Sequence, residues 1–288
     1  MFGLKQAKES GKEDLPIFKK YIYGSHHGLG MAYSEEKNFD DAMSHYLEAI
    51  EIEPNAFETY YNIGNLYLAQ DKNKEAEEYY KKALNLNPQL AEAHYNLGIV
   101  YDKQDQFQKA IFYYQQAIKL QPNWQLPRNQ LQAAQIRLNQ IESVIKESKE
   151  LLSKDPNQPQ LHKELANIYH QQGDIKSAIH YWELALKLEP DDVGILNNLA
   201  YIYATQTEGE FKNTQKAIQT AEYACELTDY KNPFMLDTLS VAYAASGRNS
   251  EAIEIAEKAL ELAVKSGDRK LTDQIGKHLE TFQNNNMP

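Results

Sequence analysis

Apolar and small residues recur along this chain in two stripes, and the pair of stripes repeats every 34 residues. In one copy, the first stripe has the i, i+3, i+4, i+7 spacing of a helix face and consists of Tyr60, Ile63, Gly64 and Tyr67. After a polar break at 71–73, a second stripe with the same spacing comprises Ala76, Tyr79, Tyr80, Ala83 and Leu84. The pattern predicts two amphipathic helices joined by a short turn.

Prolines mark the end of the second helix in five consecutive copies: Pro54, Pro88, Pro122, Pro156 and Pro190. Proline stops a helix because it lacks an N–H group and disfavours a helical residue before it. Aligning the copies shows two columns of small residues, Gly30, Gly64, Gly98, Gln132, Ala166 and Ala42, Ala76, Ala110, Val144, Ala178. An aromatic column contains Tyr46, Tyr80, Tyr114, Ser148 and Trp182. Small residues let two helices approach closely, and large rings fill the space beside them.

This arrangement resembles the signature of the tetratricopeptide repeat family. The first copy carries it at Leu29, Gly30, Tyr33, Ala42, Tyr46, Ala49 and Pro54, and the next two copies match as well. The resemblance implies an all-α fold, a right-handed superhelical solenoid of antiparallel helix pairs. The sequence also resembles bacterial members of this family that take part in the assembly of larger machinery.

The alignment predicts a repeat array over 23–266, preceded by an N-terminal tail or cap at 1–22. About seven repeats are placed at 23–56, 57–90, 91–124, 125–158, 159–192, 193–231 and 233–266. The sixth contains an insertion of five residues within 205–214. The last segment, 267–288, is expected to form a capping helix and tail, with one apolar face made of Leu271, Ile275, Leu279 and Phe282. Residues 1–13 and 284–288 are expected to be loose tails.

The fourth repeat, 125–158, is degenerate although it keeps the common length. Gln132 and Val144 are larger than the residues they replace at the closest contact between the two helices. We expect a wider helix pair there. Two interpretations stay open: either packing absorbs the changes, or this repeat is a hinge or a specialised element of a binding surface.

The net charge of −11 makes nucleic acids and anionic membranes poor partners. The single cysteine, Cys225, excludes an intrachain disulfide and is expected to be a small core residue. No secretory signal or membrane span is apparent. These features predict a cytoplasmic protein, or a periplasmic one if a signal peptide was removed.

Neither catalysis nor a cofactor is predicted, and no metal site is expected. His26, His94 and His162 share one column on a packed helix face, and the neighbouring His26 and His27 point to different sides of the helix. No His-x-x-x-His pattern with a supporting carboxylate occurs. The glycines at 24–30 lie within the first predicted helix and are attributed to helix packing.

Amides recur two residues before the glycine column, on the helix face that would line the inner side of a solenoid: Asn62, Asn96, Gln130 and Asn198. An amide can both donate to and accept from a peptide backbone, and asparagine is a mediocre helix former. We therefore predict a partner-binding groove made of Tyr61, Asn62, Asn65, Tyr95, Asn96, Ile99, Asn129, Gln130, Lys163, Asn167, Asn198 and Tyr201. The alternative is that these asparagines only satisfy contacts between repeats. The row is similar to the asparagine ladder in the repeat region of O-GlcNAc transferases, whose catalytic domain is absent here.

Some members of the family grip the acidic tail of heat-shock chaperones with a clamp of lysine, asparagine, asparagine, lysine and arginine. Lys163, Asn167 and Asn198 match the first three positions, but Phe234 and Thr238 fall at the last two. Neither side chain can bind a carboxylate by charge, which argues against a chaperone-tail adaptor.

The sequence thus favours a non-catalytic scaffold or adaptor that binds a peptide or helix of a partner protein. The alternative is a self-assembling repeat protein that forms homo-oligomers as a platform for a larger complex. Nucleic-acid binding and enzymatic activity are both disfavoured.

Overall fold

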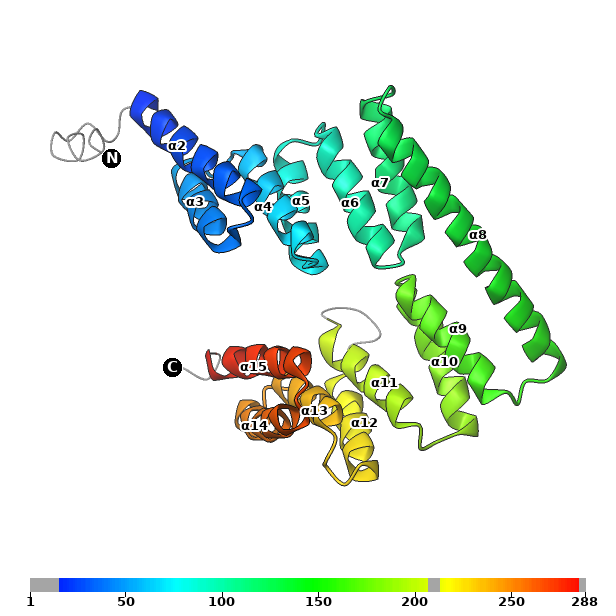
Figure 1. The fold of residues 1–288 in the computed structure, drawn as a ribbon. Helices are drawn as coiled ribbons and strands as arrows, with labels where there is room; N and C mark the ends of the chain where they lie inside the picture. Colours follow the sequence, from blue (N-terminus) through cyan, green and yellow to red (C-terminus); the bar gives the residue numbers. More distant parts are fainter. Residues whose placement is uncertain (1–15, 207–212, 285–288) are drawn as a thin grey trace. The chain divides into compact units, whose positions relative to one another are not determined.

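The computed structural model describes residues 16–206 and 213–284, and within these ranges the chain is all-α, with 14 helices and no strand (Figure 1). The chain divides into two compact units. Among the described residues, unit 1 comprises 16–145 and 171–173, and unit 2 comprises 146–170, 174–206 and 213–284. None of the described helices is both long and apolar enough to cross a lipid bilayer.

Unit 1 is built from successive helix pairs. Its helices are α2 (Pro16–Glu35), α3 (Phe39–Ile52), α4 (Phe57–Ala69), α5 (Asn73–Leu86), α6 (Ala91–Lys103), α7 (Phe107–Leu120) and the first part of α8 (Gln125–Lys154). Helix α2 packs against α3, α4 against α5 and α6 against α7. These pairs confirm the predicted helix–turn–helix copies in this part of the chain.

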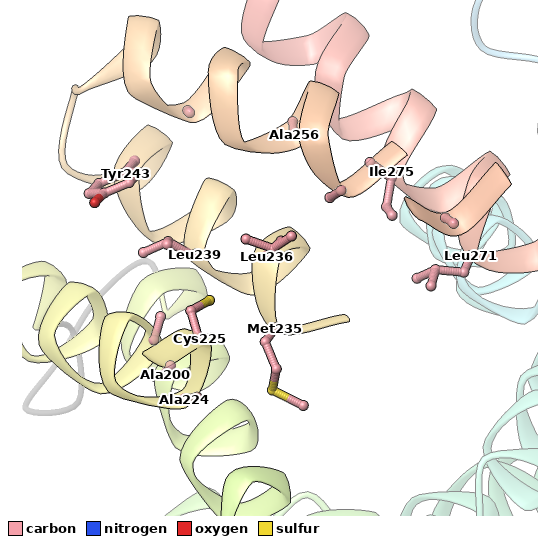
Figure 2. Close-up of a cluster of buried hydrophobic side chains, with 14 of the residues drawn as sticks. Ala200, Ala224, Cys225, Met235, Leu236, Leu239, Tyr243, Ala256, Leu271 and Ile275 are labelled. Carbon is pink, nitrogen blue, oxygen red and sulfur yellow. The ribbon is translucent and has the colours of Figure 1, made fainter. Parts of the chain in front are cut away.

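Unit 2 continues from the last part of α8. Its further helices are α9 (Pro159–Gln171), α10 (Ile175–Leu188), α11 (Val193–Thr205), α12 (Thr214–Leu227), α13 (Pro233–Ala245), α14 (Asn249–Ser266) and α15 (Arg269–Asn284). The core formed by α11 to α15 is shown in Figure 2, with Cys225 of α12 and with Leu236 and Leu239 of α13. Cys225 is fully buried there, as predicted.

The turn inside five of the described pairs uses a residue with left-handed backbone. In the fifth and seventh repeats this residue is a glycine, Gly173 (φ 79°) and Gly247 (φ 83°), which adopts the conformation without steric cost. The equivalent residues of the first three repeats are Lys37, Asp71 and Asp105, with φ of 55–59°. The turn therefore forms even where no glycine reduces its cost, because packing of the two helices compensates for it.

The small and aromatic columns meet inside each of the first three repeats. A Cβ atom added to Gly64 would lie 2.6 Å from Cδ1 of Tyr80, and one added to Gly30 would lie 2.6 Å from Cδ1 of Tyr46. Tyr46 and Tyr80 are buried, and so is Ala76 of the alanine column. The predicted pairing of small and large columns is confirmed.

The prediction of a wider helix pair in the fourth repeat is wrong, because α8 runs unbroken from Gln125 to Lys154. Asn139, which occupies the turn column, is helical. Folding back would bring Gln132 against Ser148, where other repeats bury a ring against a glycine or alanine. Without that burial, nothing offsets the cost of the turn, and a continuous helix is favoured. The interpretation of this repeat as a hinge or as a specialised element of a binding surface stays untested.

Three of the four apolar residues predicted on the final helix face are buried, namely Leu271, Ile275 and Phe282. They join the core of unit 2, with Leu279 packed beside it. The five-residue insertion is predicted within 205–214, where α11 ends at Thr205 and α12 begins at Thr214. Residues 207–212 of this range lie outside the described residues. The predicted tails lie outside them as well, except Asn284, which ends α15.

Candidate functional site

The predicted groove residues are divided between the two units. Eight of the twelve lie in unit 1, on α4, α6 and the first part of α8, and four lie in unit 2, on α9 and α11. We therefore describe each group by itself.

The amides of unit 1 are engaged in hydrogen bonds between repeats. Asn62 Nδ2 donates to His27 Nε2 across 3.3 Å, and His27 Nδ1 lies 2.9 Å from Thr59 Oγ1. Burial lowers the pKa of His27, so its ring is neutral at pH 7 and can accept through Nε2 while it donates through Nδ1. Asn62 thus connects the first helices of two neighbouring repeats.

Asn96 makes a similar connection one repeat later. Its Nδ2 donates to Asn65 Oδ1 across 2.8 Å and lies 3.3 Å from the Tyr80 hydroxyl. The same hydroxyl donates to Asn65 Oδ1 across 2.8 Å. Asn65 and Asn96 are half-buried, and their amides form a hydrogen bond between two repeats.

The aromatic residues predicted beside this row also pack within the array. The Tyr61 ring lies 5.9 Å from that of Tyr80, and the Tyr95 ring lies 4.8 Å from that of Trp124. Burial raises the pKa of Tyr95, whose hydroxyl is hydrogen-bonded to Gln130. The side chain is therefore held in place and neutral at physiological pH.

The two remaining predicted residues of unit 1 differ in exposure. Ile99 is half-buried against the core. Asn129 is exposed and accepts a hydrogen bond from Gln125 Nε2 across 2.9 Å. None of the eight residues in unit 1 therefore offers a buried, unoccupied polar group.

In unit 2, two predicted residues are likewise engaged. Lys163 Nζ lies 2.6 Å from an Asp192 carboxylate oxygen and 2.7 Å from one of Glu189. The hydrogen bond to Asp192, together with that to Glu189, raises the pKa of Lys163. Asn167 Oδ1 accepts a hydrogen bond from Trp182 Nε1 across 3.2 Å.

Asn198 and Tyr201 of α11 differ from the others because they line a pocket. Both residues are exposed, and neither side chain forms a hydrogen bond within the described residues. The hydroxyl of Thr205 donates to the backbone carbonyl of Tyr201, not to its side chain. The pocket has a volume of about 190 Å³ and lies wholly within unit 2. Its walls are formed by Asn198 and Tyr201 together with His170, Asn197, Ile202, Phe234, Asp237, Thr238 and Gln274.

The polar groups of this pocket include a carboxylate and several amides. Asp237 is buried, and its two carboxylate oxygens accept from His278 Nδ1 and Gln274 Nε2, each across 2.8 Å. The side-chain oxygen of Asn197 is buried without a hydrogen-bond partner in the described part of the chain. Burial lowers the pKa of His170, so this wall residue is neutral at pH 7. No lysine or arginine lines the pocket.

Sequence reasoning missed Asn197 and Asp237 as wall residues. Both lie in the column three residues before the glycine position, the column of Tyr61 and Tyr95. Reading that column to the seventh repeat would have found them. Phe234 and Thr238, which the sequence places at two clamp positions, also line the pocket, and neither carries a charge.

The stacked helix pairs define a helical-repeat protein. Family models match this chain at 55–123 and 235–266, both described as tetratricopeptide repeat, and at 30–71 and 166–206, described as TPR repeat. The chain belongs to the tetratricopeptide repeat family. A comparison with curated protein sequences finds no match.

Solved structures of several repeat proteins are similar to parts of this chain. The first TPR of Spaghetti (RPAP3) bound to the HSP90 peptide SRMEEVD is 20% identical, covering 41% of this chain and 94% of that chain with a TM-score of 0.40. The TPR2AB domain of yeast Sti1 in complex with pHSP90 is 16% identical, covering 92% and 99% with a TM-score of 0.40. YrrB, a TPR protein with an unusual peptide-binding site, is 18% identical, covering 81% and 97% with a TM-score of 0.36.

Proposed function

We propose that this protein is a non-catalytic scaffold or adaptor that binds a segment of a partner protein. The observation that carries the proposal is the contrast between two sets of amides. Asn62, Asn65, Asn96 and Asn167 are occupied by contacts inside the array, whereas Asn198 lies exposed at a pocket without such a contact. Within the predicted row, Asn198 is thus the amide available to an incoming peptide.

The chemistry of the pocket suits a peptide. Asn198 can donate to and accept from a backbone amide, and Tyr201 and Phe234 offer exposed ring surface beside it. The pocket volume of about 190 Å³ is below the roughly 300–1,000 Å³ typical of small-molecule sites. We infer that the pocket admits one side chain of a partner while the rest of the segment lies across α11 and α13.

The test begins with selection of binding peptides from a displayed random library, using the full chain as bait. Binding of a selected peptide is then measured by calorimetry for the Asn198→Ala and Tyr201→Ala variants. We expect each variant to weaken binding at least tenfold. Asn129→Ala serves as the control, because Asn129 is an exposed amide of the same predicted groove on α8. Equal affinity of all variants would contradict the proposed site.

A second candidate function is self-association, for which α8 supplies a specific observation. Leu126, Ile136 and Val144 fall within about a quarter of the helix circumference and are 53%, 51% and 47% exposed. Sedimentation velocity at two concentrations would detect oligomers, and Ile136→Lys with Val144→Lys would then disperse them. Val264→Lys, at a valine of α14 that is 59% exposed, is the matched control.

A further inference from the structure

Two histidines and one glutamate meet between the two helices of the first pair. Nδ1 of His26, on α2, lies 3.1 Å from Nδ1 of His45 and 3.0 Å from Oε2 of Glu48, both on α3. All three atoms lie within 4.8 Å of one another. In the described part of the chain, this is the only group of three such side chains that could hold a metal ion.

The helix geometry holds these groups in place. His45 and Glu48 are three residues apart on α3 and therefore share one face. The Tyr33 ring stacks on the His45 ring with centroids 5.5 Å apart and an interplanar angle of 9°. The His26 and Glu48 side chains are 19% and 49% exposed, so an ion can reach them from solvent.

The same positions in other repeats show what packing alone requires. In the third and fifth repeats, His94 and His162 occupy the column of His26 and face Tyr113 and Tyr181, with ring centroids 5.9 and 6.0 Å apart. Their Nε2 atoms lie 3.0 and 2.9 Å from the carbonyl oxygens of Pro88 and Pro156. These two histidines thus connect a helix to the preceding loop.

The first repeat departs from this arrangement in both helices. His45 stands where the second, third and fifth copies have Tyr79, Tyr113 and Tyr181. His26 is contacted through Nδ1 rather than through Nε2. Glu48 stands where the second and third repeats have Lys82 and Gln116. Packing explains a ring at each of the two columns, but not a second imidazole together with a carboxylate.

Protons satisfy this arrangement poorly. If His26 Nδ1 carries a hydrogen, this one N–H cannot point fully at both His45 Nδ1 and the Glu48 carboxylate. If His26 Nδ1 carries no hydrogen, its lone pair faces a lone pair of the Glu48 carboxylate. A cation at the centre would interact favourably with all three atoms at once. Two ligand atoms about 2.0–2.1 Å from a tetrahedral ion are about 3.3 Å apart, close to the separations found here.

We infer that His26, His45 and Glu48 form a binding site for a divalent transition-metal ion. Two imidazole nitrogens and one carboxylate oxygen suit Zn²⁺ and its close analogues, and three protein ligands leave one position for water. The ion would join α2 to α3 and so stabilise the first repeat. Because it would bind only the folded pair, it would also raise the melting temperature, and this rise would grow with the logarithm of the ion concentration above the dissociation constant.

The experiment titrates the untagged full chain with Zn²⁺ by calorimetry and with Co²⁺ by visible absorption. We expect one ion per chain, ligand-field bands typical of a four-coordinate site, and a Zn²⁺-dependent rise in melting temperature. His45→Tyr introduces the residue of the second, third and fifth repeats and should reduce the affinity at least a hundredfold. His94→Tyr, which introduces the residue that the second repeat carries in the His26 column, should leave the affinity unchanged.

Circular dichroism checks that the His45→Tyr variant folds. If this variant does not fold, Glu48→Gln provides a second test, because the Glu48 side chain is exposed. Glu48→Gln should reduce the affinity at least tenfold. The inference is overturned if the wild-type chain binds no ion, or if His45→Tyr and Glu48→Gln bind as tightly as wild type. It is also overturned if His94→Tyr abolishes binding.

Discussion

The hydroxyl of Tyr80 donates a 2.8 Å hydrogen bond to the side-chain oxygen of Asn65. One repeat later, Ile99 stands in the place of Asn65, and the equivalent hydroxyl of Tyr114 is buried without a partner in the described part of the chain. Tyr80→Phe should therefore lower the free energy of unfolding by about 1 kcal/mol, whereas Tyr114→Phe should be neutral or stabilising. Urea denaturation followed by circular dichroism measures both. Equal losses would show that the Asn65 contact contributes nothing.

Gly64 is required because the Tyr80 ring occupies the space of a side chain. A Cβ at Gly64 would lie 2.6 Å from that ring, so Gly64→Leu should cost about 1–3 kcal/mol or more of unfolding free energy. Gly28 is the matched control, because a Cβ there meets nothing within 4 Å. Gly28→Ala should raise stability by about 0.5–1 kcal/mol, since alanine is the better helix former. A stable Gly64→Leu variant would contradict the packing described for this column.

Loss of an amide that is hydrogen-bonded within the array should lower stability more than loss of an amide without such a bond. Asn96→Ala removes donors to Asn65 Oδ1 and should cost about 1 kcal/mol. Asn198→Ala removes no hydrogen bond within the described residues and should change stability by less than about 0.5 kcal/mol. Chemical denaturation of both variants checks this difference. A larger loss for Asn198→Ala would place that residue in the array rather than at a binding surface.

Asn139 tests the continuity of α8. Because it is helical, Asn139→Ala should be about 1 kcal/mol more stable than Asn139→Gly. At Asp105, whose φ is 57°, the order should reverse, since only glycine adopts this conformation without cost. If glycine were the more stable choice at position 139 as well, the fourth repeat would contain a turn.

Cys225 should be unreactive in the folded chain. The thiol is fully buried, and burial raises its pKa to about 12. Only the thiolate reacts rapidly with a disulfide reagent, so at pH 8 native protein should react at a small fraction of the rate seen in urea. Similar rates in both conditions would show that the core of unit 2 opens readily.

The repeat period predicts which residues build each helix pair, since small and aromatic side chains must alternate to fill the space between two helices. It does not predict whether a degenerate copy folds back, because that depends on the burial lost at Gln132 and Ser148 against the cost of a turn. Nor does it reveal partners on a different helix. Asn96 reaches Asn65 one repeat away, and His45 reaches His26 across a helix pair. These contacts decide which amides stay available.

The most direct test of the proposed binding site is photocrosslinking from Tyr201. A photoreactive phenylalanine analogue is placed at Tyr201 or, as control, at Tyr223, which has nearly the same exposure, 39% against 40%, but lies on α12. A library-selected peptide should crosslink from position 201 and not from position 223. Crosslinking from neither position, or from both equally, would contradict a binding site at the α11 pocket.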